Sequence, residues 1–65
     1  MSQAGKKIRH FRIEKKMSVE ELALRIRCGT KTLENYENGT ITPNLQTILK
    51  ISTALDIPAS ELTES

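Results

Sequence analysis

The sequence predicts an all-α fold, a compact bundle of five short helices. The chain has 65 residues, too few for two independent hydrophobic cores, so one domain is expected over residues 1–65. Hydrophobic residues make up 37% and charged residues 28% of the chain, which fits a folded globular protein. Apolar residues recur at helical spacing between turn residues, and the alternation typical of strands is nearly absent.

The first helix is expected over residues 4–15, because Ala4, Ile8 and Phe11 share one face. The second begins after Ser18. A serine followed three residues later by Glu21 predicts a capping box, in which each side chain bonds a backbone donor of the other residue. The apolar residues of this helix form one stripe: Val19, Leu22, Ala23 and Ile26.

The third helix is expected over residues 30–37, with Leu33 and Tyr36 turned inward. Asn38 and Gly39 end it, because both residue types tolerate the left-handed conformation found at helix C-termini.

Thr42 is the expected N-cap of the fourth helix, with Pro43 in the first helical position. After it, Ile57 and Pro58 start a last helical turn that returns Leu62 to the core. The expected inward stripe of the fourth helix is Leu45, Ile48, Leu49, Ser52 and Leu55.

Only residues 26–29 separate the second and third helices. Such a short connection makes two short helices cross steeply, which is the geometry of a helix-turn-helix. Three segments in order, SVEELA at residues 18–23, TKTLENYENG at 30–39 and PNLQTILKI at 43–51, resemble the Cro and phage-repressor type of helix-turn-helix, the XRE family. The resemblance covers about residues 5–62 and implies a lambda-repressor-like DNA-binding domain.

The resemblance implies that the third helix enters the major groove while the second lies across the DNA backbone. Thr30, Lys31 and Asn35 align with the base-reading positions of the family. Their side chains suit a thymine methyl, guanine O6 and N7, and adenine, respectively. Glu34 either accepts from cytosine N4 or stays solvated and repels wrong sequences.

Phosphate contacts are expected from five residues, partly because free amides at helix N-termini attract anions. Many relatives carry glutamine where this chain has Val19, and valine cannot bond a phosphate through its side chain. Anchoring on the DNA backbone is therefore expected to depend more on arginines. The phosphate-contacting candidates are Ser18, Val19, Arg9, Arg27 and Asn38.

Two features are expected to be structural. Arg12 and Glu37 align with a buried ion pair that some family members use to tie the first helix to the third. Arg27 stands where the family usually has a glycine of positive φ, so either the turn is strained or its geometry is altered.

Charge divides the chain, with nine Lys and Arg against three Glu in residues 1–33 and one Lys against five acids in residues 34–65. A basic first half suggests a polyanionic partner. One cysteine, Cys28, and one histidine, His10, make neither a zinc shell nor a catalytic triad, so no metal, cofactor or enzyme activity is expected. No apolar run reaches a membrane span, and a cytoplasmic location is expected.

The predicted function is a sequence-specific regulator of transcription that binds double-stranded DNA, as a repressor and as a homodimer on an inverted-repeat operator. One monomer offers few contacts, so two are expected to pair. The alternative is a protein-interaction module, such as an antitoxin whose main role is to bind a toxin. The expected dimer interface is Ile57, Pro58, Ala59 and Leu62.

Overall fold

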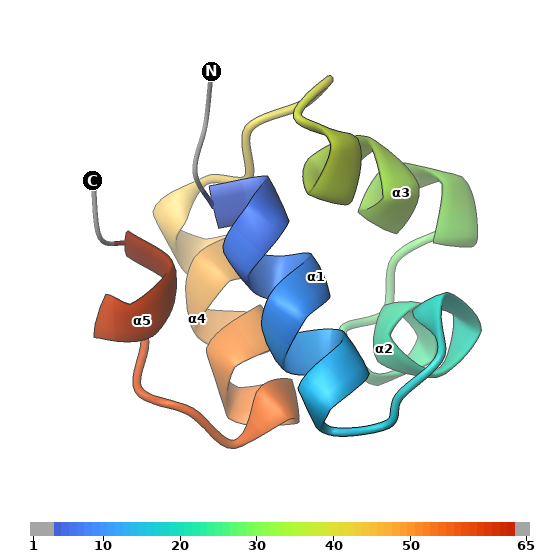
Figure 1. Ribbon diagram of the computed structural model, residues 1–65. Helices are drawn as coiled ribbons and strands as arrows, with labels where there is room; N and C mark the ends of the chain where they lie inside the picture. The colour runs from blue at the N-terminus through green and yellow to red at the C-terminus, as the bar shows by residue number, and fades with distance from the viewer. Residues whose placement is uncertain (1–3, 64–65) are drawn as a thin grey trace.

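The computed structural model describes residues 4–63 and shows five helices in this part of the chain (Figure 1). Within these residues there is no strand, and the predicted all-α class is confirmed. The first three and last two residues of the expected domain lie outside the described residues. The helices are α1 (Ala4–Glu14), α2 (Val19–Arg25), α3 (Thr30–Asn38), α4 (Leu45–Leu55) and α5 (Ser60–Thr63).

Helix α1 runs across the front of the molecule, with α4 and α5 on one side and α2 and α3 on the other (Figure 1). It packs against α3, α4 and α5, while α2 packs against α3 and α4. The molecule measures 26 × 23 × 20 Å along its principal axes. None of the described helices combines the length and the apolar character that crossing a membrane requires.

All five helices contribute apolar side chains to one core. Burying one leucine or isoleucine side chain stabilises a fold by about 1.5–3 kcal/mol, so these side chains hold the short helices together. Leu62 at the end of the chain reaches this core, as predicted. The buried apolar residues are Ile8, Leu22, Ala23, Ile26, Leu33, Ile48, Ile51, Leu55 and Leu62.

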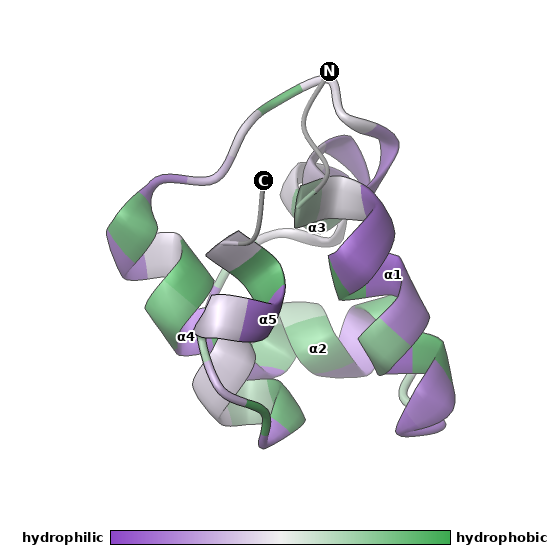
Figure 2. Ribbon diagram, turned by 60° about the vertical axis from the view of Figure 1, so that its left-hand side comes forward, coloured by the Kyte–Doolittle hydropathy of each residue, from purple (hydrophilic) through white to green (hydrophobic). Residues whose placement is uncertain are grey.

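The predicted inward stripe of α4 is partly wrong. Leu45 is 64% exposed and Leu49 is 48% exposed, whereas Ile51 is fully buried. Helix α4 carries apolar residues on two overlapping stripes, and packing against α2 and α5 selects the one that contains Ile51. The other stripe is left facing solvent, and Figure 2 shows the hydrophobic colouring that remains along α4.

The predicted start of α4 is also wrong. Asn44, not Thr42, is the N-cap, and its Oδ1 accepts a hydrogen bond from the backbone N–H of Thr47 at 2.8 Å. Asparagine is a stronger N-cap than threonine, and starting the helix there leaves Pro43 buried in the preceding loop.

The N-cap of α2 is as predicted, because Ser18 Oγ accepts from the backbone N–H of Glu21 at 3.0 Å. The second half of the expected capping box is absent. The Glu21 carboxylate instead pairs with Arg25 Nη2 at 3.0 Å, one turn further along the helix.

Four helices end in a residue with positive φ: Lys16 after α1, Arg27 after α2, Gly39 after α3 and Asp56 after α4. At the ends of α1, α2 and α4, the backbone N–H groups of the left-handed residue and of the next residue donate to carbonyl oxygens of the last helical turn, as in a Schellman motif. Glycine is the residue that adopts this conformation without strain. Gly39 confirms the predicted end of α3, while the other three ends use residues with a Cβ.

Candidate nucleic-acid interface

The turn between α2 and α3 consists of residues 26–29. Arg27 has φ 59°, as its glycine-like position predicts, and its N–H donates to Leu24 O at 3.2 Å. The N–H of Cys28 donates to Ala23 O at 2.9 Å, and Ile26 is buried. These contacts fix the path of the chain from α2 into α3 with no intervening loop.

Helix α3 turns Leu33 and Glu37 into the molecule and half-buries Tyr36. Three of the four predicted base-reading residues, Lys31, Glu34 and Asn35, lie away from Leu33, and Thr30 is the first residue of the helix. Lys31 and Glu34 are exposed, and Thr30 and Asn35 are half-buried. Residues three and four positions apart share a helix face, so Lys31, Glu34 and Asn35 can approach one ligand together.

Glu37 holds α3 against α1 through a two-pronged ion pair with Arg12. Arg12 Nε lies 2.6 Å from Glu37 Oε2, and Arg12 Nη2 lies 3.1 Å from Oε1. The pair is largely dry, with the side chains 13% and 3% exposed. Arg12 Nη1 also donates to Met17 O at 2.9 Å, so one guanidinium joins α1, the following loop and α3.

A polar depression of about 420 Å³ opens beside this ion pair, where α1, the start of α2 and the end of α3 meet. It brings together three of the predicted phosphate-contacting residues: Arg9, Val19 and Asn38. Arg9 is 54% exposed, and its Nε lies 3.5 Å from Glu37 Oε1. Glu37 therefore aligns Arg9 at the rim while leaving most of its side chain accessible.

Ser18 and Asn38 are both engaged locally. The hydroxyl of Ser18 caps α2, and Asn38 Oδ1 accepts from Thr40 N–H at 2.9 Å. Asn38 is the last residue of α3, as predicted, so α3 offers no free N-terminal amides beside it. The C-terminal end of a helix repels anions, so only the side-chain amide of Asn38 can donate to a phosphate there.

Arg27 lies apart from this depression. It lines a second, separate groove together with residues of α4. Four of the five predicted phosphate-contacting residues thus gather around the start of α2 and its neighbours, and the fifth sits in the turn.

Gly5 is a feature that reasoning from the sequence missed. It is buried where α1 crosses α3, and a Cβ built on it would lie 2.3 Å from the backbone oxygen of Tyr36 and 2.8 Å from that of Glu37. A glycine inside a helical pattern is the signal that marks such a close approach.

Cys28 is half-buried against the core. Burial raises the pKa of its thiol, and a hydrogen bond with the Leu33 backbone and the charge of Lys50 lower it by less. The thiol is therefore protonated near neutral pH and is a poor nucleophile. Within residues 4–63, no three histidine, cysteine or carboxylate side chains gather as a metal would require.

The expected dimer interface needs one correction. Leu62 is only 1% exposed because it fills the core between α1 and α4, so it is not available to a second subunit. Pro58 is exposed, and Ile57 and Ala59 are half-buried.

A tight turn between α2 and α3, with polar side chains on the outer face of α3, defines the helix-turn-helix class of DNA-binding domain. A family model described as Helix-turn-helix matches residues 8–62, and the chain belongs to this family, as its resemblance to the XRE type predicted. The chain is thus a helix-turn-helix DNA-binding domain.

A particular relative is the cryptic phage CTXphi transcriptional repressor RstR of Vibrio cholerae. It is 39% identical to this chain over 56 residues, which are 86% of this chain and 50% of RstR. The chain therefore spans about half the length of this relative.

Proposed function

We propose that this chain is a sequence-specific regulator of transcription that binds double-stranded DNA in the cytoplasm and acts as a repressor. The observation that carries the proposal is the orientation of α3. Its buried residues, Leu33 and Glu37, leave Lys31, Glu34 and Asn35 together on the outer face, with Thr30 half-buried at the start of the helix. The name of the Vibrio relative, a transcriptional repressor, supports the sign of regulation.

In this proposal α3 reads base edges in the major groove. Lys31 donates to guanine O6 and N7, Asn35 pairs with adenine through both atoms of its amide, and Thr30 contacts a thymine methyl. Glu34 is exposed beside them, where it accepts from cytosine or repels sequences that bring a phosphate close.

Arg9 and the start of α2 are proposed to hold the DNA backbone. Glu20 and Glu21 lie in the first turn of α2, where their charge opposes a phosphate, although Glu21 is paired with Arg25. The arginines therefore carry more of this contact than the α2 amides do. Arg9 has the better support, because it lies at the rim of the polar depression with Val19 and Asn38.

Useful specificity requires two reading helices, so we propose a homodimer on an inverted repeat, with half-sites about one helical turn apart. The exposed and half-buried side chains between α4 and α5, Ile57, Pro58 and Ala59, are the proposed contact. Leu62 is not part of this interface.

Titrating a fluorescent duplex with the protein across a range of salt concentrations tests the backbone contacts. Removing one phosphate contact should reduce the slope of log K against log salt by about 0.9. We expect this reduction for Arg9→Gln and Arg27→Gln. Lys15→Gln, which removes an equal charge from an exposed residue outside the proposed contact, is the matched control.

An unchanged slope would remove the substituted arginine from the contact. Equal reductions in all three variants would mean that net charge, not position, governs binding.

A further inference from the structure

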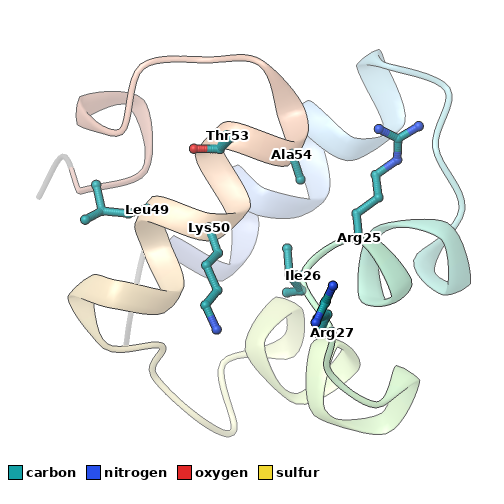
Figure 3. A pocket seen from close by; sticks show the side chains of 7 residues that line it. All are labelled: Arg25, Ile26, Arg27, Leu49, Lys50, Thr53 and Ala54. Atoms are coloured by element: carbon teal, nitrogen blue, oxygen red, sulfur yellow. The ribbon is translucent and has the colours of Figure 1, made fainter.

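A groove of about 690 Å³ lies between α4 and the end of α2 with its following turn (Figure 3). It contains none of the proposed base-reading residues, and α1 lies behind it in this view. The residues that line it are Arg25, Ile26, Arg27, Leu49, Lys50, Thr53 and Ala54.

The groove combines an apolar floor with an apolar extension along α4. Ile26, Leu49 and Ala54 supply its carbon surface. Leu45, one turn before Leu49, is 64% exposed and continues the same side of α4 toward the groove's end. From Leu45 to Thr53, α4 rises about 12 Å. This length is enough to contact about two turns of another helix that packs alongside α4.

The charges around this floor have one sign. Arg25, Arg27 and Lys50 line the groove, and no acidic residue does. Arg25 pairs with Glu21 at 3.0 Å, but within residues 4–63 no carboxylate pairs with Arg27 or Lys50. The long side chains of Lys50 and Arg27 flank the floor in Figure 3.

Arg27 lines this groove, and its backbone is in the left-handed conformation, with φ 59°. A glycine would relax the turn but would remove one of the two unpaired cations from the groove.

The arrangement discriminates between occupants. A second copy related by a twofold axis through this groove would set Arg27 and Lys50 against the same two cations, so like charges disfavour it. A nucleic-acid backbone would use the cations but would leave the apolar floor uncovered. An amphipathic helix with acidic flanks matches both features.

We propose that this groove docks an acidic amphipathic helix of another protein. Large apolar side chains on one face of that helix cover Leu45, Leu49 and the half-buried Ala54, and its carboxylates pair with Arg27 and Lys50. The docked helix contacts α4 and the turn of the helix-turn-helix, and it leaves the outer face of α3 accessible to DNA. The proposal is independent of which DNA sequence α3 reads.

The test uses two synthetic helical peptides of about 15 residues, long enough to be partly helical. Both carry leucine at one amphipathic stripe; one has Glu at the remaining positions and the other Lys. Labelled with ¹⁵N, the full chain is titrated with each peptide and its backbone amide shifts are followed. We expect micromolar binding of the Glu peptide, with shifts concentrated in residues 25–27 and 45–54, and no binding of the Lys peptide.

Three variants sharpen this test. Leu49→Ser should weaken binding of the Glu peptide about tenfold, whereas Ile13→Ser, which removes another exposed apolar side chain, on α1, should leave it unchanged. Arg27→Gly should weaken binding about fivefold while raising the melting temperature. A residue that acted only on the stability of the fold would not move these two readouts in opposite directions.

Equal binding of both peptides, a Kd of the Glu peptide weaker than about 1 mM, or insensitivity to Leu49→Ser would overturn the proposal. Shifts of the α4 amides of residues 45–54 by duplex DNA, in competition with the Glu peptide, would assign the groove to nucleic acid and would overturn the proposal equally. A shift by DNA that is confined to Arg27 is the phosphate contact proposed above.

Discussion

Glu37 of α3 forms ion pairs with two arginines of α1, Arg9 and Arg12, and so connects the two helices. Its carboxylate is 3% exposed and accepts from Arg12 at 2.6 Å, with Arg9 at 3.5 Å. A dry ion pair contributes little over an apolar pair of the same shape, but removing one partner leaves the other charge buried and uncompensated. Arg12 would be left in that state, because its other protein contact is the single carbonyl of Met17.

Glu37→Gln should therefore destabilise the fold by about 3–5 kcal/mol, most or all of the stability of a chain this size. Urea denaturation followed by circular dichroism measures the loss. Arg9→Gln is the control, because Arg9 is 54% exposed and its contact with Glu37 is long, so a change within about 1 kcal/mol is expected. A Glu37→Gln melt that matched the wild type would refute the structural role of the pair.

Arg27 occupies a backbone conformation that costs a residue with a Cβ about 1–2 kcal/mol. Glycine removes this strain but adds about 0.4–1 kcal/mol of chain entropy to the unfolded state. Arg27→Gly should therefore stabilise the fold by about 0.5–1 kcal/mol and raise Tm by several degrees.

Arg27→Ala separates the backbone from the side chain, since alanine keeps the strain and removes the guanidinium. Thermal denaturation should show a gain for glycine and none for alanine. A clear drop in Tm with glycine would contradict the account of this turn.

At the scale of the helices, the contact between α1 and α3 depends on the absence of one side chain. Gly5 allows the backbones to approach so closely that a Cβ would meet the carbonyl oxygens of Tyr36 and Glu37. These atoms belong to the last turns of α3, so they cannot move without displacing the Arg12–Glu37 pair.

Gly5→Ala should accordingly destabilise the fold by at least about 1–3 kcal/mol, the usual cost of overpacking, by forcing α1 away from α3. Gly29→Ala is the matched control: the nearest atom to its Cβ would be Thr32 Oγ1 at 3.9 Å, and Gly29 has an ordinary φ of −74°. Denaturant midpoints of the two variants measure the difference. Equal midpoints would show that α1 and α3 do not pack this closely.

In helix α4, the spacing of apolar residues predicts a helix but does not identify the face that is buried. Leu45 and Leu49 extend the same apolar pattern as Ile48 and Leu55, and the sequence alone does not say which stripe faces the core. Only the positions of α2 and α5 decide that Ile51 is buried and Leu49 is not. Two residues, Thr42 and Asn44, can serve as the N-cap of α4, and the helix begins after Asn44 because asparagine is the stronger N-cap.

At the scale of the whole molecule, the fold could be predicted because each helix carries its own signal: the Ser18 cap, the Gly39 end and the return of Leu62 to the core. The Arg12–Glu37 pair was predicted from the family resemblance and is present. Of the two alternatives left open for Arg27, a strained turn or an altered one, the structure shows the left-handed conformation. The sequence did not reveal the close approach of Gly5 to α3, a contact between distant segments, or the local hydrogen bond from Arg12 to the carbonyl of Met17.

The separation of charge along the sequence is not fully preserved in the folded molecule. Residues 1–33 are basic and residues 34–65 acidic, yet Glu37 of the acidic half lies inside the molecule against two arginines of the basic half. The negative charge of Glu37 therefore does not act on the surface, and the charge of each half of the sequence overstates the separation of charge in the folded molecule.

Whether α3 reads DNA sequence can be measured by selecting bound duplexes from a random pool at near-physiological salt, with the wild type and Asn35→Ala in parallel. We expect a palindromic site from the wild type, and relaxed preference at one symmetric pair of positions from the variant. The duplex contact and the homodimer would then stand together. Binding that is sensitive to salt but blind to sequence, or an identical site from both proteins, would contradict sequence reading by α3.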